Sequence, residues 1–86
     1  MSGMALDILY FAWVREGVGI GQESIEPPVG VVTVGGLVSW LAERKGFEVL
    51  ADQAKLRAAV DQQFVSFDAP IAGAREVAIF PPVTGG

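Results

Sequence analysis

The groups in this chain that could perform chemistry are few. Its 86 residues include no cysteine and no histidine. A cysteine nucleophile, a Ser-His pair and thiolate or imidazole metal ligands are therefore excluded. What remains is a carboxylate, a hydroxyl, a lysine or an end of the chain.

The C-terminal end is the strongest candidate for a reactive group. Its last six residues are Pro81, Pro82, Val83, Thr84, Gly85 and Gly86. Pro81 and Pro82 cannot continue the hydrogen-bond ladder of a sheet, so they stiffen the exit from the last strand. Fully extended, this tail reaches at most about 20 Å. Because Gly85 and Gly86 have no side chains, the tail fits a channel little wider than backbone and presents the Gly86 carboxylate. A frayed chain end is the alternative interpretation.

Two other motifs give weaker signals. The Gly-Val-Gly-Ile-Gly run at 17–21 resembles a phosphate-binding loop, but it lacks the Gly-Lys-Ser/Thr ending and the strand-to-helix context. Glu23 and Glu26 are carboxylates that we expect on the solvated edge of a strand. Neither motif is as strong a candidate for a functional site as the tail.

The elements that must position the tail are short strands around one main helix. Residues 6–14 are β-branched and aromatic, with apolar side chains on both faces, which is typical of a strand inside a sheet. We expect a loop over 15–21 and a short helical turn over 51–55. The other expected strands are 22–26, 57–62, 64–67 and 75–80.

The main helix is predicted over residues 34–45. Thr33 suits the N-cap position, because its hydroxyl accepts a hydrogen bond from a free backbone N–H of the first turn. Gly46 is a natural stop, and residues 43–45 form the solvated end. The apolar residues that follow helical spacing form one stripe: Val34, Leu37, Val38 and Leu41.

This order of elements predicts an α+β domain over residues 1–80, followed by an extended tail over 81–86. If the first and last strands lie parallel at the centre, the helix covers one sheet face. The other face then keeps Leu9, Phe11, Phe64 and Phe80. A small protein rarely leaves such a patch open, so we expect it to bind a partner. The alternatives are a cover of the chain's own loops or a strand phase shifted by one residue.

Charge and hydropathy narrow the class of partner. The net charge of −4, with 6 basic against 10 acidic residues, argues against nucleic acid. The longest uncharged stretch, residues 27–42, is too short and too interrupted by proline and glycine to span a membrane. No cationic region precedes the first apolar segment, as a signal peptide would require. We expect a cytoplasmic protein that binds other proteins.

Several segments together resemble one known family. The ending Phe80-Pro-Pro-Val-Thr-Gly-Gly86 is similar to that of the small subunits of molybdopterin synthase, which are ubiquitin-like β-grasp proteins. The similarity extends to residues 10–19, 56–68 and 76–80, and thus to nearly the whole chain. The resemblance implies a β-grasp fold, a mixed sheet of four to five strands packed on one main helix.

The resemblance also implies a sulfur carrier that is not catalytic alone. An ATP-dependent adenylating enzyme would activate the Gly86 carboxylate, and a sulfur donor would convert it to a thiocarboxylate. The tail would then enter the large synthase subunit, in a heterotetramer, and give its sulfur to cyclic pyranopterin monophosphate. No stably bound cofactor or metal is implied, because the sulfur is carried covalently. Docking would use Phe11, Phe64 and Phe80 together with the tail from Pro81 to Thr84.

The chain departs from the family pattern at three places. Asp61 stands where the family usually has Asn, the loop 72–75 lacks an acidic turn, and Gly35 and Gly36 replace better helix formers. Three alternative functions stay open: a sulfur carrier for another pathway such as thiazole synthesis, a ubiquitin-like protein modifier, and an adaptor with an inert tail.

Overall fold

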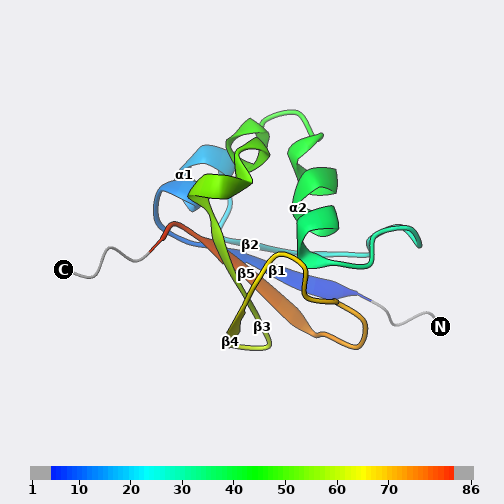
Figure 1. Ribbon diagram of the computed structural model, residues 1–86. Helices are drawn as coiled ribbons and strands as arrows, with labels where there is room; N and C mark the ends of the chain where they lie inside the picture. The colour runs from blue at the N-terminus through cyan, green and yellow to red at the C-terminus, as the bar shows by residue number, and fades with distance from the viewer. Residues whose placement is uncertain (1–4, 83–86) are drawn as a thin grey trace.

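A mixed five-stranded sheet forms the centre of the molecule, which the computed structural model describes from residue 5 to residue 82. The strand order is β2-β1-β5-β3-β4. All the helices lie on one side of this sheet (Figure 1). The strands are β1 (Leu6–Tyr10), β2 (Gln22–Ile25), β3 (Arg57–Val60), β4 (Gln63–Val65) and β5 (Glu76–Phe80).

The last strand of the sequence lies in the middle of the sheet. β5 pairs in parallel with β1 and antiparallel with β3. The core-facing residues of the two central strands, Ile8, Val77 and Ile79, are completely buried. The predicted parallel pairing of first and last strands is confirmed, and so is the β-grasp arrangement of a mixed sheet on one main helix.

The main helix, α2 (Val34–Ala42), begins where the sequence predicted. The Thr33 hydroxyl accepts a hydrogen bond from the Gly36 N–H at 3.0 Å, which confirms the N-cap. The four residues of the predicted apolar stripe are all completely buried. The predicted end was wrong by three residues, because the Glu43 and Arg44 N–H groups bond to carbonyls only three positions back and so tighten the last turn.

The predicted strand over 6–14 was wrong beyond Tyr10, and so was the loop that followed it. Phe11 is still extended, but Ala12 has a φ of 55° and turns the chain into a second helix, α1 (Ala12–Val18). Val14 and Val18 lie four residues apart on this helix, and both face the core. The same apolar residues therefore fit a strand pattern and a helix pattern.

Gly17 explains why a glycine-rich segment forms a helix here. An added Cβ at Gly17 would lie 2.9 Å from the side chain of Val49, so only glycine lets α1 approach the next element this closely. That element is η1 (Glu48–Ala51), a 3₁₀ helix followed by η2 (Gln53–Lys55). The sequence predicted one helical turn over 51–55, and the structure has two turns, the first of which begins earlier, at Glu48.

The hairpin of β3 and β4 is tighter than predicted. β3 ends at Val60 rather than at residue 62, because Asp61 and Gln62 both have positive φ, 48° and 72°. Two such residues form the kind of turn whose twist matches paired strands. β4 accordingly occupies 63–65 instead of 64–67, and β5 starts one residue later than predicted.

Candidate functional site

The sheet face opposite the helices carries an apolar surface. Side chains alternate between faces along a strand, and β5 directs Val77 and Ile79 into the core. Their neighbours on β5, together with the register partners on adjacent strands, share the opposite face. We call this set the open face, and it consists of Leu9, Arg57, Ala59, Phe64, Ala78 and Phe80.

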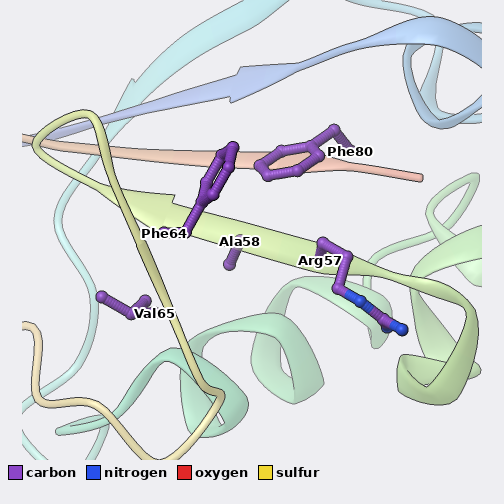
Figure 2. A pocket seen from close by; sticks show the side chains of 5 residues that line it. All are labelled: Arg57, Ala58, Phe64, Val65 and Phe80. Atoms are coloured by element: carbon purple, nitrogen blue, oxygen red, sulfur yellow. The ribbon is translucent and has the colours of Figure 1, made fainter. Parts of the chain in front are cut away.

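Two phenylalanines form the most prominent feature of the open face. The rings of Phe64 and Phe80 contact each other, with centroids 5.6 Å apart and planes tilted by 43°. Figure 2 shows the two rings close together above β3, the strand that lies between β4, which carries Phe64, and β5, which carries Phe80. Beside them lies a shallow hollow of about 260 Å³, lined also by Arg57, Ala58 and Val65. Phe64 is 80% exposed, so no described loop covers it.

Phe11 lies at the edge of this surface. It follows the last residue of β1, and its N–H donates a hydrogen bond to the Ile79 carbonyl at 3.2 Å. Its side chain is 47% exposed. Among residues 5–82, ring contact joins Phe64 to Phe80 but joins Phe11 to neither. The structure therefore brings two of the three predicted phenylalanines together and leaves the third beside them.

The start of the tail is part of the same region. Pro81 and Pro82 follow Phe80 directly and are half-buried. They leave the sheet at the end of β5 that lies next to α1 (Figure 1). The other predicted tail residues, Val83, Thr84, Gly85 and Gly86, lie outside the described residues.

A polar cluster beneath the open face holds the end of β1. The buried Tyr10 hydroxyl donates to Glu23 Oε2 at 2.8 Å, and Arg44 Nη1 donates to the same oxygen at 2.8 Å. Arg44 also stacks over the Phe47 ring. Burial, followed by the Glu23 hydrogen bond, raises the pKa of Tyr10, and the same carboxylate raises the pKa of Arg44.

This cluster corrects the expectation for Glu23. Its side chain is only 14% exposed and forms an ion pair with Arg44, whereas Glu26 is exposed as predicted. All members of the cluster have partners, and the phenol stays protonated because its pKa is raised. The cluster therefore positions β1 and supplies no reactive group.

Asp61 has a structural role of its own. Its Oδ1 accepts hydrogen bonds from the Arg75 and Glu76 N–H groups, both at 3.0 Å. An Asn at this position has the same acceptor atom. Either Asp or Asn at this position can therefore accept these two hydrogen bonds. The departure from the family pattern does not remove the contact between the turn and β5.

Residues 5–82 form neither of two other candidate sites, a metal centre or a membrane span. No group of three or more acidic, histidine or cysteine residues comes together there to hold a metal ion. No helix in this part of the chain has the length and apolar character to cross a membrane.

Comparison with known proteins decides the family. The ThiS family model matches residues 8–86, which include the whole open face and the tail. This chain belongs to the ThiS family. Two relatives, both named molybdopterin synthase sulfur carrier subunit, align with it over 82 residues. The one from Escherichia coli is 44% identical and the one from Haemophilus influenzae 32%, each covering 94% of this chain and 99% of the relative.

A solved structure supports the fold of this ThiS-family chain. It is a putative molybdopterin converting factor, subunit 1, from Pyrococcus furiosus. It matches with a TM-score of 0.71 at 27% identity and covers 94% of this chain and 100% of its own. The β-grasp fold expected from sequence resemblance is thus that of a related solved structure.

Three residues of the open face, Arg57, Ala59 and Ala78, were not singled out from the sequence. Arg57 follows no apolar pattern, and it joins the surface only because the register places it opposite Phe80. The signal that would have found it is the pairing of the 57–60 and 76–80 strands.

Proposed function

We propose that this chain is the sulfur carrier subunit of a molybdopterin synthase. The observation that carries the proposal is the 44% identity, over nearly the full length of both chains, to the Escherichia coli protein of that name. In this proposal residues 1–80 are the domain that partners recognise, and residues 81–86 are the tail that carries sulfur.

The proposed chemistry takes place at the Gly86 carboxylate. A carboxylate is inert until one oxygen becomes a good leaving group, and the adenylating enzyme provides this by transferring AMP from ATP with release of pyrophosphate. Sulfide from a donor then displaces AMP and leaves a thiocarboxylate. This group is a nucleophile that needs no cysteine, histidine or metal from the chain. Delivery of the sulfur to cyclic pyranopterin monophosphate ends with Gly86 as a carboxylate again.

The open face is the proposed docking surface for both partners, the adenylating enzyme and the large synthase subunit. Phe64 and Phe80 provide its centre and Phe11 its edge, while Pro81 to Thr84 lead the terminus into the partner's channel. The exposure of Phe64 supports this assignment, since buried aromatic anchors dominate the energetics of many interfaces. Because both partners would use one surface, they bind alternately. The use of ATP and the absence of cysteine support a cytoplasmic location.

Intact mass spectrometry tests the chemistry. The chain is incubated with ATP, the adenylating enzyme and a sulfur source, and its mass should shift by the replacement of one oxygen with sulfur in the C-terminal peptide. A variant lacking Gly86 should still bind the large subunit but show no shift. The proposal is overturned if the intact chain shows no shift while a carrier of known activity does.

Two further measurements separate the alternative functions. Copurification with a molybdopterin synthase large subunit supports the proposal, whereas copurification with thiazole-synthesis proteins alone contradicts it. Conjugates of high molecular weight that contain Gly86 in an isopeptide bond would instead identify a protein modifier.

A further inference from the structure

Charged side chains of opposite sign stand at the two ends of the open face. At the end where the tail leaves, Arg57 pairs with Phe80. Beyond the other end Asp7 pairs with Glu76, and both lie on the same side of the sheet as the open face because each precedes a buried residue of its strand. Arg57 is the one cation that the described strands place on this face.

The two charged ends are far enough apart to act separately. Glu76 and Phe80 are the first and last residues of β5, so the two rows lie about 13 Å apart at the ordinary rise of a strand. This exceeds the Debye length of about 8 Å at physiological ionic strength. A partner therefore meets a positive end and a negative end, with the apolar residues between them.

Hydrogen bonds to backbone carbonyls hold the Arg57 guanidinium in place, and no described carboxylate pairs with its charge. Its Nη1 donates to the Leu56 carbonyl at 2.8 Å and more weakly to the Ala54 carbonyl at 3.5 Å. In Figure 2 its stem starts beside the Phe64 and Phe80 pair and its guanidinium turns away from the rings. Within residues 5–82 no carboxylate forms an ion pair with it. Its other N–H donors can therefore bind an acceptor on a partner.

The acidic end likewise forms no ion pair among the described residues, although Arg75 directly precedes Glu76. The Ser24 hydroxyl donates to Asp7 Oδ1, which orients the carboxylate and leaves its charge unchanged. Neither Asp7 nor Glu76 forms an ion pair with a described cation. Both groups stay available to cations on a partner.

We propose that this charge polarity fixes the orientation in which the open face docks. The matching partner is a protein surface with an apolar patch, a carboxylate on the side where its channel admits the tail, and a cation on the opposite side. This inference rests on the proposed function, in which the tail must enter such a channel. If only apolar contacts held the open face to its partner, this chain could dock in two orientations related by a half turn. Only one of them directs the tail into the partner's channel. In the other orientation like charges would meet at both ends, which penalises wrong docking.

Charge reversal at Arg57 tests the inference. Arg57→Glu, Arg57→Lys and wild type are titrated into the large subunit of the chain's own molybdopterin synthase at low and high salt. Lys55→Glu is the matched control, because Lys55 is an exposed cation on η2, outside the open face, and the change in net charge is the same. We expect Arg57→Glu to raise Kd by about tenfold or more at low salt, Lys55→Glu by about twofold, and Arg57→Lys by less than about threefold. The excess effect of Arg57→Glu should shrink at high salt.

The outcomes separate this inference from the proposed function. Equal effects of Arg57→Glu and Lys55→Glu overturn the orientation role, even if wild type binds tightly. Failure of wild type to bind the large subunit overturns the proposed function and this inference together. Thermal unfolding of each variant shows whether it is folded, and Arg57→Lys keeps the inference testable if the reversed charge unfolds the chain.

Discussion

Truncation of Phe64 is the sharpest test of the open face, because this ring contributes little to the fold and much to the proposed interface. At 80% exposure, docking would remove about 100 Å² more surface from water for Phe64 than for an alanine. At about 25 cal/mol per Å², Phe64→Ala should weaken partner binding by about 2.5 kcal/mol, or about 70-fold in Kd.

The same substitution should leave the fold almost intact. The ring of Phe64 lies on an edge strand, where it contacts the Phe80 ring. Loss of this pair costs about 1 kcal/mol or less in the free energy of unfolding. Binding and stability should therefore respond very differently to one change.

Two measurements carry this test. Isothermal titration with the large synthase subunit gives Kd, and urea unfolding gives stability. Val29→Ala is the control, because Val29 is 97% exposed and apolar but lies in the loop between β2 and α2. The reasoning is refuted if Phe64→Ala binds within about twofold of wild type, or if it loses several kcal/mol of stability.

Further predictions concern the helix glycines and the buried phenol. Gly36→Ala should stabilise the fold by up to about 1 kcal/mol, because an added Cβ meets nothing closer than 3.4 Å and alanine favours helix. Gly35→Ala should give no such gain in urea unfolding, because its Cβ would lie 3.2 Å from the Phe67 carbonyl oxygen; equal gains at both positions would contradict the packing argument. Burial and the Glu23 hydrogen bond raise the pKa of Tyr10 above its ordinary 10.0, so the folded state keeps a proton that the unfolded chain loses. Stability should thus be complete below about pH 10 and fall above it by up to about 1.4 kcal/mol per pH unit, and Tyr10→Phe should remove this component; an unchanged alkaline slope would refute it.

The parts of the fold that could be predicted are determined by residues close together in the sequence. The cap and stripe of α2 lie within nine consecutive residues, from Thr33 to Leu41, and their pattern fits one helix face only. The core side of β5, with Val77 and Ile79, follows from simple alternation. Phe64 and Phe80 could be assigned to one face for the same reason.

The parts that were missed depend on contacts distant in sequence. Helix α1 forms from residues that also suit a strand, and it needs the close approach of Gly17 to Val49, which no local pattern reveals. Glu23 becomes an ion-pair partner only because the turn after α2 brings Arg44 to β2. Arg57 joins the open face through strand register alone.

The central place of β5 links synthesis of residues 76–80 to folding of the sheet. β1 and β3 each pair with β5, so the sheet cannot close until Glu76–Phe80 has left the ribosome. A nascent chain that stops earlier exposes two unpaired strand edges and the apolar underside of α2, the kind of surface that chaperones and proteases act on. Every folded molecule has therefore been translated through Phe80, the residue directly before the proposed sulfur-carrying tail. A partner that docks on the folded sheet, as proposed, would therefore bind only chains synthesised through the strand that the tail follows.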